Sequence, residues 1–383
     1  MKTAALSKVA EINPRPSSIA ANVPVSFVGM AELNATTATA VTLDTRYYGD
    51  VSKGYTVFRN GDVLAAKITP CWENGKIGQA ALDHAIGVGS TEFHVLRPGS
   101  ELDDRYLLHF LRQSHIRDLG ELRMTGSAGQ RRVPAEFLRS LQIPLPPLAE
   151  QRRIAAILDQ VDTLRAKRRH VLAHLGALPQ AIFRDMFGAD AEQTSLGAVV
   201  SFYSGATPSK ARKEYWEGDL PWFSSKDLKA PDLWDSTDHL ARQVTQQTPL
   251  KLLPPGTVAI GVRGMILAHT VPVTTLRVPA TINQDLKALL PLVEVDVDFL
   301  AAAIRARSEW ILARVSTAAH GTKKLDSTIL ESIPIPRADP SRQREFARRA
   351  NKVRASRTAA QRAAAADDEL FASLQAGAFR GNL

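Results

Sequence analysis

The sequence predicts an α+β protein: two similar mixed α/β domains joined by two long antiparallel coiled-coil helices and related by a pseudo-twofold internal repeat. Three observations support this fold class. Residue strings recur once along the chain, each copy opens with a segment rich in β-branched residues and Gly/Pro turns, and each copy closes with a long helical segment. The length of 383 residues suits two or three domains of about 150 residues each.

The internal repeat is carried by matches at a common offset. Residues 138–144 and 330–336 share Leu, Ser, an aliphatic residue, Ile and Pro 192 positions apart, and the same offset aligns Gln151 with Gln343. Solenoid repeats have periods of roughly 20–50 residues, so this period indicates a duplicated domain followed by a duplicated helix. The predicted boundaries of domain, helix, domain and helix are residues 1–149, 150–187, 188–339 and 340–383.

The first helical segment carries a seven-residue apolar repeat, which is typical of a helix that pairs with another helix, and the second helix takes its seam by transfer at the offset of 192 residues. The prolines of residues 144–147 predict that the first helix starts after them, and Pro179 is expected to kink or end it. An antiparallel pair within one chain is the favoured interpretation, and two surface helices packed on their own domains are the alternative. The predicted seam of the first helix consists of Ile154, Ile157, Val161, Leu164, Val171, Leu175 and Leu178, and Arg168 interrupts it. The predicted seam of the second helix, obtained at the same offset of 192, consists of Phe346, Val353, Leu370 and Leu374.

Signatures of catalysis are missing from the sequence. No phosphate-binding P-loop, no GxGxxG after a strand, no GxSxG elbow and no HExxH motif occurs. The single cysteine, Cys71, excludes an intramolecular disulfide and a cysteine zinc site. His170 and His174 have the spacing of metal ligands but lie off the apolar seam, which favours a solvated helix face. A binding scaffold is therefore expected rather than an enzyme.

The location of the protein follows from what the chain lacks. No apolar run approaches the roughly 18 residues needed to span a bilayer, and Lys8 interrupts any apolar core of a secretory signal. A cytoplasmic protein is expected.

The charge of the chain is unevenly distributed. The formal net charge is +9, of which the two helical segments carry +3 and +5, so that +8 lies in the helices and the two domains are almost neutral. A basic excess favours a polyanionic partner. Recognition by near-neutral domains must depend on a few placed side chains. The helical charge could face DNA or acidic protein surfaces, and composition leaves both open.

The proline-rich entry to the first helix resembles a known family. Residues 143–154, IPLPPLAEQRRI, with residues 181–184, resemble the conserved region of type I restriction-modification specificity subunits. Residues 68–76, 126–133, 204–210 and 320–325 resemble loop and closing segments of the target-recognition domains of that family. The second conserved region is degenerate, because it keeps Gln343 but lacks the Pro-Leu-Ala-Glu lead-in.

This resemblance implies a function. Each target-recognition domain would read one half of a bipartite sequence in double-stranded DNA, and the helices would set the spacer and dock two modification subunits. Those subunits would bring S-adenosylmethionine, and restriction subunits, where present, would bring ATP and Mg. The chain itself would catalyse nothing and hold no cofactor or metal. The alternatives are a stand-alone DNA-binding regulator with two unlike domains and a protein-binding scaffold.

Candidate DNA contacts are polar side chains in loops, since Arg and Lys read guanine, Asn and Gln read adenine, and Ser, Thr, Lys and Arg contact phosphates. The alternative for each is an ordinary solvated loop residue, and Trp216 and Trp222 are expected in the core. In the first domain the candidates are Lys67, Thr69, Asn74, Lys76, Gln130, Arg131 and Arg132; in the second they are Ser204, Thr207, Lys210, Ser225, Lys226, Arg263, Lys323 and Lys324.

Overall fold

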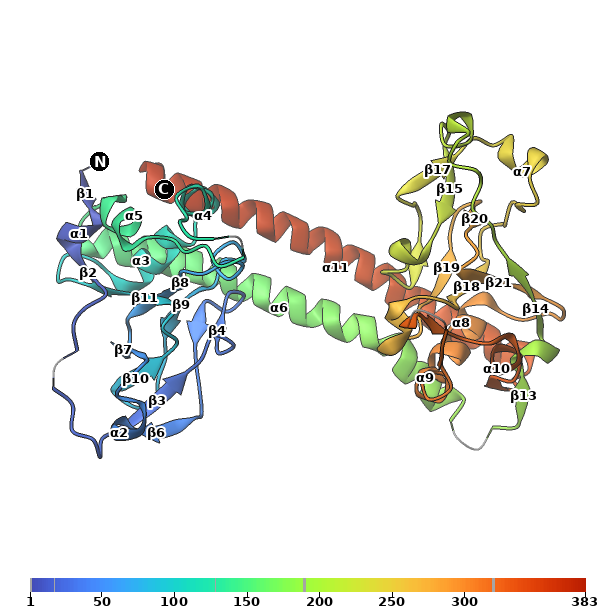
Figure 1. The fold of residues 1–383 in the computed structure, drawn as a ribbon, viewed down its shortest axis with the longest axis horizontal. Helices are drawn as coiled ribbons and strands as arrows, with labels where there is room; N and C mark the ends of the chain where they lie inside the picture. Colours follow the sequence, from blue (N-terminus) through green and yellow to red (C-terminus); the bar gives the residue numbers. More distant parts are fainter. Residues whose placement is uncertain (1, 17, 128, 189–190, 319–320) are drawn as a thin grey trace. The chain divides into compact units, whose positions relative to one another are not determined.

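The computed structural model describes residues 2–16, 18–127, 129–188, 191–318 and 321–383. The chain divides into two compact units. Unit 1 consists of Met1–Val171 with Ala360–Leu383, and unit 2 consists of Leu172–Ala359. Each unit therefore combines one mixed α/β domain with one half of each long helix, α6 (Leu148–Met186) and α11 (Pro340–Arg380) (Figure 1). The helix α6 continues through Pro179 without ending there.

Unit 1 contains two sheets of mixed strand direction, with strand orders β6-β3-β10-β7 and β2-β11-β8-β9-β5-β4. Its helices are α1 (Leu6–Val9), α2 (Tyr48–Val51), α3 (Asp104–Leu111), α4 (Ser114–Leu122) and α5 (Ala135–Ser140). Its strands are β1 (Thr3–Ala5), β2 (Ala10–Ile12), β3 (Pro24–Val28), β4 (Leu33–Asn34), β5 (Thr39–Ala40), β6 (Thr45–Tyr47), β7 (Thr56–Arg59), β8 (Val63–Ala66), β9 (Ile77–Ala80), β10 (Ile86–Gly89), β11 (Phe93–Pro98) and β12 (Gln142–Pro144).

Unit 2 contains sheets with strand orders β14-β21-β18-β19-β16 and β17-β15-β20. Its helices are α7 (Val244–Gln247), α8 (Val297–Arg305), α9 (Ser308–Leu312) and α10 (Ser327–Glu331), with the 3-10 turns η1 (Leu196–Ala198), η2 (Lys213–Tyr215), η3 (Ser225–Asp227) and η4 (Met265–Ala268). Its strands are β13 (Gln193–Ser195), β14 (Val200–Ser204), β15 (Leu220–Phe223), β16 (Asp232–Leu233), β17 (Asp238–Leu240), β18 (Val258–Gly261), β19 (Val273–Leu276), β20 (Thr281–Ile282), β21 (Leu286–Pro291), β22 (Ser316–Thr317), β23 (Lys323–Lys324) and β24 (Pro334–Pro336).

The sequence repeat is also a repeat of contacts. The first and last strands of each domain pair antiparallel, β1 with β12 and β13 with β24. The aligned glutamines make the same hydrogen bond in both units. The Gln151 side chain accepts a hydrogen bond from the backbone N–H of Asp103 at 2.9 Å, and Gln343 accepts one from Asp296 at 2.9 Å. Both aspartates are the N-caps of a helix, α3 in unit 1 and α8 in unit 2. Each of the two aligned glutamines thereby fixes a domain helix to a long helix.

The two long helices run antiparallel within each unit. In unit 1, Arg165 of α6 pairs with Asp368 of α11 at 2.6 Å, and Arg168 pairs with Asp367 at 3.1 Å. In unit 2, the ring centroids of Phe183 and Phe346 lie 5.4 Å apart. Contacts of later residues of α6 are made with earlier residues of α11, which is the pattern of an antiparallel pair. The predicted fold class is confirmed, and the alternative of two separate surface helices is wrong.

One half of the predicted seam is displaced by one residue. Leu164, Val171, Leu178 and Leu370 are 41–48% exposed, whereas Leu158 and Phe371, which follow the predicted Ile157 and Leu370, are buried. The predicted positions Leu164, Val171, Leu178 and Leu370 are therefore corrected. The other predicted residues are buried or half-buried, namely Ile154, Ile157, Val161, Leu175, Phe346, Val353 and Leu374.

The displacement has a physical cause. The first part of α6 packs on its own domain as well as on α11, and the core of unit 1 includes Ile154, Ala155 and Leu158 beside residues of α3. A helix that packs on two partners buries a wider arc than a two-stranded coiled coil does, and the arc is centred between the partners. The heptad periodicity of the sequence predicts that one face of each long helix is buried, but it does not predict which residues lie at the centre of that face.

Candidate nucleic-acid interface

In unit 1, the loop after β8 and the segment after α4 are held together by backbone hydrogen bonds. The Val133 N–H donates to the Lys67 carbonyl at 2.8 Å, and the Thr69 N–H donates to the Arg131 carbonyl at 3.0 Å. An isolated β-bridge joins Ile68 to Arg132. These two stretches are more than 50 residues apart in the sequence. Two separately predicted groups of candidates, Lys67 with Thr69 and Arg131 with Arg132, therefore form one cluster.

Acidic neighbours hold the side chains of this cluster. Arg132 pairs with Glu92 at 2.8 Å, and this hydrogen bond lowers the pKa of the Glu92 carboxyl. Arg131 lies 3.9 Å from Glu73, too far for a hydrogen bond, and the Thr69 hydroxyl donates to the same carboxylate at 2.6 Å. The guanidinium of Arg132 is thus fixed in plane, whereas that of Arg131 has less restraint and is the better placed of the two to bind an incoming acceptor.

The remaining candidates of unit 1 lie around the same loop. Asn74 and Gln130 are exposed, but the ammonium group of Lys76 donates to the Met30 carbonyl at 2.7 Å. The loop is anchored by Trp72, which is fully buried and donates its ring N–H to the Arg117 carbonyl at 2.8 Å. A Cβ at Gly120 would come within 2.3 Å of this ring, so only glycine fits there. The buried Trp72 thus holds the loop in place while its polar side chains stay exposed, which is what a recognition loop requires.

Unit 2 repeats the arrangement of unit 1. The Leu325 N–H donates to the Val262 carbonyl at 2.9 Å, the Gly264 N–H donates to the Lys323 carbonyl at 3.0 Å, and a β-bridge joins Arg263 to Lys324. The bond from Leu325 to Val262 corresponds to the bond from Val133 to Lys67 in unit 1. Three predicted candidates, Arg263, Lys323 and Lys324, are therefore brought together.

Two of the three side chains of that cluster have hydrogen-bond or ion-pair partners within unit 2. Lys324 pairs with Asp326 at 2.6 Å, which lowers the pKa of the aspartate, and Lys323 donates to the Thr317 hydroxyl at 2.9 Å. Arg263 is exposed. His320, at the start of the predicted closing segment, lies outside the described residues, as does Ala128 in the corresponding segment of unit 1.

The other candidates of unit 2 come from residues 204–210 and 225–226. Thr207 donates to the side chain of Gln284 at 2.6 Å, and Lys226 pairs with Asp238 at 2.7 Å. Ser204 and Lys210 are exposed, and Ser225 is half-buried. Within the described part of the chain, no hydrogen bond or ion pair joins these five residues to the cluster of Arg263, Lys323 and Lys324. The expectation that Trp222 is a core residue agrees with its burial, and the Trp216 ring packs edge-on against it at 5.1 Å.

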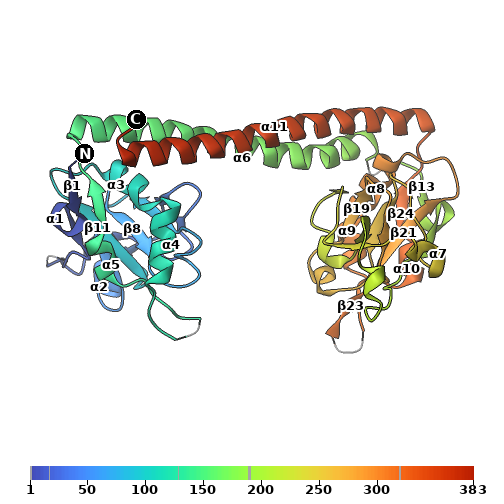
Figure 2. The ribbon, with the colours of Figure 1, turned by 90° about the horizontal axis from the view of Figure 1, so that it is seen from above.

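Both clusters lie at the end of their domain that is remote from the long helices. Figure 2 shows β23 at the far end of unit 2, and the segment after α4 at the far end of unit 1. In each unit the helices cover the opposite end. A macromolecule bound at the clusters would leave the helices of that unit accessible.

The acidic residues at these clusters are absent from the sequence-based candidates. Glu73, Glu92 and Asp326 hold arginine, lysine and threonine side chains in place. A carboxylate binds neither a phosphate nor the acceptor groups of guanine, so its residue type does not mark it as a residue that orients a DNA contact. The position of Glu73 inside the predicted loop was an available signal, whereas Glu92 reaches Arg132 across 40 residues.

The described residues give no sign of a membrane or metal site. None of their helices combines the length and apolar character required to cross a membrane. They contain no group of three or more His, Cys, Asp or Glu side chains arranged to hold a metal ion.

Comparison with known proteins identifies the domains. A family model for the type I restriction modification DNA specificity domain matches residues 2–173 and, a second time, residues 189–360. The two matches have equal length and follow one another, as expected for a duplication.

Individual relatives carry the same description. The chain is 42% identical over 161 residues to the type I restriction enzyme EcoAI specificity subunit of Escherichia coli, covering 42% of this chain and 27% of that protein. It is 32% identical over 208 residues to the EcoR124I/EcoR124II specificity subunit of Escherichia coli, covering 52% of this chain and 51% of that protein. The chain thus spans about a quarter to a half of these relatives.

Two solved structures share the fold along the whole chain. One belongs to a study of complex assembly and conformational transition of the type I R-M system, with a TM-score of 0.63 and 22% identity over 100% of this chain and 98% of the other. The other is the S subunit of a type I restriction-modification system from M. genitalium, with a TM-score of 0.58 and 14% identity over 99% and 96%. At these identities the likeness establishes the fold alone.

Proposed function

Because the chain belongs to the family of the type I restriction modification DNA specificity domain, we propose that it is the DNA-reading subunit of a type I restriction-modification complex. Each domain reads one half of a bipartite site in double-stranded DNA. One observation carries the proposal: the same backbone hydrogen bond, from Val133 to Lys67 and from Leu325 to Val262, brings basic side chains together at corresponding places of both domains.

The contacts divide between reading and positioning. Arg131 in unit 1 and Arg263 in unit 2 are the exposed or weakly restrained guanidinium groups, so we assign them to base edges, where arginine binds guanine through two hydrogen bonds. Arg132, Lys323 and Lys324 have local partners and suit phosphates, which set register without reading sequence. The exposed candidates Asn74, Gln130, Ser204, Thr207 and Lys210, with Thr69, Ser225, Lys226, Lys67 and Lys76, would complete the two surfaces.

The long helices serve the complex in two ways under this proposal. They set the spacer between the half-sites and dock two modification subunits, which bring S-adenosylmethionine and methylate adenine. Exposed aliphatic side chains such as Leu164 and Leu370 supply apolar surface for that contact. Restriction subunits, where present, add ATP- and Mg-dependent translocation and cleavage. The chain itself is non-catalytic and acts in the cytoplasm, where the DNA is.

The first test is DNA binding by single variants at the clusters. Arg131→Ala should cost about 1–3 kcal/mol of binding free energy at one position of the target and relax the preference there. Lys324→Ala should weaken binding to all sequences and reduce the slope of log affinity against log salt by about one. Lys8→Ala is the matched control, because Lys8 is an exposed cation of α1 outside both clusters. Unchanged affinity and salt slope in both cluster variants would contradict the assignment.

The second test identifies the target itself. DNA from cells that carry this chain and its modification partner is sequenced for methyladenine. The expected result is a bipartite motif with an unspecified spacer, and exchange of residues 1–149 for those of another family member should change only one half of it. A stand-alone regulator would bind without any partner and leave no methylation motif. A protein-binding scaffold would leave no sequence-selective footprint on DNA.

A further inference from the structure

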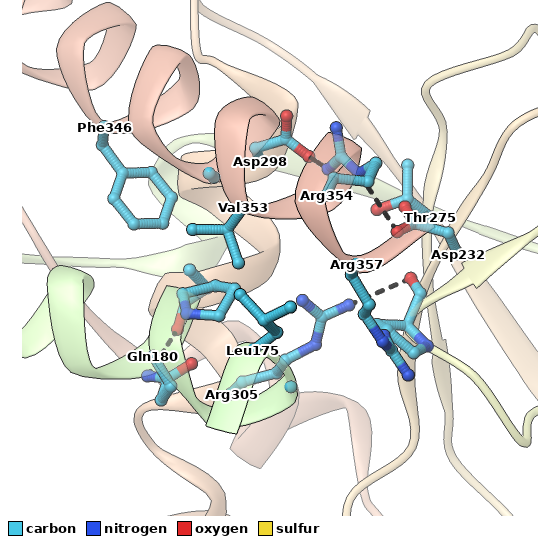
Figure 3. Close-up of a pocket in the computed structure, with 15 residues that line it drawn as sticks. Leu175, Gln180, Asp232, Thr275, Asp298, Arg305, Phe346, Val353, Arg354 and Arg357 are labelled. Carbon is cyan, nitrogen blue, oxygen red and sulfur yellow. Dashed lines mark hydrogen bonds and ion pairs between the residues drawn. The ribbon is translucent and has the colours of Figure 1, made fainter. Parts of the chain in front are cut away.

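A pocket of about 150 Å³ lies in unit 2, where the two long helices meet α8 (Figure 3). Gly176 and Gln180 come from α6, Ala302 and Arg305 from α8, and Arg357 from α11. The candidate DNA contacts do not line it. Its origin becomes clear when unit 2 is compared with the corresponding region of unit 1.

Two glutamines establish which residues correspond. In unit 1, the Gln375 side chain donates to the His109 carbonyl of α3 at 2.9 Å. In unit 2, the Gln180 side chain donates to the Ala302 carbonyl of α8 at 3.3 Å. One helical turn before these glutamines, on the same helix face, stand Phe371 in unit 1 and Gly176 in unit 2.

In unit 1, the phenylalanine fills the space between the helices and the domain. Phe371 is 8% exposed, and its ring centroid lies 6.2 Å from that of His109. The guanidinium carbon of Arg165 lies 4.4 Å from the ring centroid of Phe371. Arg165 also pairs with Asp162 at 2.7 Å and with Asp368 at 2.6 Å. One cation is therefore satisfied by an aromatic ring and by carboxylates.

In unit 2, the ring and the two carboxylates that pair with Arg165 have no counterpart at the corresponding positions of the long helices. Gly176 replaces the phenylalanine, and a Cβ built on it meets no atom within 4 Å. Ala302 replaces the histidine. Arg357, which is 192 positions after Arg165, has no hydrogen-bond or ion-pair partner among the described residues. The pocket is the space that the absent ring leaves, and an arginine without a counter-ion borders it.

The charges that line the pocket favour an anion. Arg354 binds both Asp232 and Asp298, so those carboxylates are engaged (Figure 3). The half-buried Arg305 donates to the carbonyls of Pro231 and Val273, at 3.1 and 3.0 Å, and desolvation by burial lowers its pKa. The lining thus has three arginines against two aspartates. A partly buried positive excess is stabilised by a bound anion.

We propose that this pocket binds a small aromatic carboxylate, with the ring in the place of the missing phenylalanine and the carboxylate on Arg357. A cavity of about 150 Å³ is large enough for a benzene-sized ring. The guanidinium of Arg357 can donate two parallel hydrogen bonds to the carboxylate. The occupant would bridge α6, α8 and α11 and would stabilise unit 2.

The test uses the full chain and benzoate as the probe, followed by thermal unfolding and calorimetric titration. Benzoate should raise the unfolding temperature saturably, cyclohexanecarboxylate should bind more weakly, and acetate should give no saturable effect. Arg357→Gln should weaken benzoate binding about tenfold, through loss of the charged hydrogen bonds to the carboxylate. Lys352→Gln removes an exposed charge from the same helix outside the pocket and should bind as the parent chain does.

A second variant tests the space rather than the charge. Gly176→Phe supplies the ring that unit 1 has and should abolish saturable benzoate binding, and Gly176→Leu serves the same purpose if the larger side chain prevents folding. No saturable response of the parent chain to benzoate would overturn the proposal. So would equal binding by the Arg357→Gln and Lys352→Gln variants, or an acetate response equal to that of benzoate, which would mark an adventitious ion only.

Discussion

Replacement of Phe371 by alanine tests which face of α11 is buried. The ring is 8% exposed, and it packs in the core of unit 1 with the guanidinium of Arg165 above it. Loss of a buried phenylalanine side chain costs about 3–5 kcal/mol, and the stacked arginine adds about 0.5–1 kcal/mol. Because unit 2 tolerates an open pocket at the corresponding place, we expect the low end, about 3 kcal/mol.

Leu370→Ala is the matched control, one residue away on the same helix. Leu370 is 48% exposed, and alanine and leucine have similar helix propensities, so its replacement should cost less than about 1 kcal/mol. The heptad pattern of the sequence predicts the opposite order, because it places Leu370 in the seam.

Urea unfolding gives the two free energies, and hydrogen exchange of peptides from α3 and from residues 360–380 localises the effect. Phe371→Ala should speed exchange in both peptides, because the ring joins α11 to α3. A Leu370→Ala variant that loses as much stability as Phe371→Ala would refute the buried face described above, as would exchange that is unchanged in α3.

Two further substitutions test the contacts of the helices. Burial raises the pKa of Asp159, but hydrogen bonds from His109 and Arg105 outweigh it and lower the pKa to about 2. A carboxyl whose pKa is lower in the folded state stabilises the fold at a pH above its unfolded pKa, near 4, and this stabilisation is lost as the pH falls through the folded pKa of about 2. In urea unfolding, Asp159→Asn should therefore cost about 1–2 kcal/mol at pH 7, since Asp159 is partly exposed, and almost nothing at pH 2. Gly176→Ala should stabilise unit 2 by about 0.5–1 kcal/mol in thermal unfolding, because its Cβ meets open space, whereas Gly120→Ala should destabilise unit 1, because its Cβ would strike a tryptophan ring; equal effects at the two glycines would contradict this difference.

Much of the candidate interface was predictable because loop chemistry is local. Arg131 and Lys324 follow turns that contain glycine, and their residue type limits what they can bind. Their assembly with Lys67 and Arg263 was not predictable from either stretch alone, because it depends on backbone bonds that join segments far apart in the sequence. Glu73 and Glu92 were not predicted for the same reason, because no sequence pattern marks a carboxylate that orients a distant arginine.

The sequence by itself determined the duplication, the two long helices and the absence of catalytic motifs, because periodicity and residue type depend only on neighbours along the chain. Tertiary structure alone decided which helix face is buried, since α6 packs on a domain as well as on α11. It also decided that a glycine at 176 opens a pocket where Phe371 closes one. Burial and vacancy are properties of what surrounds a residue, and those surroundings come from residues distant in the sequence.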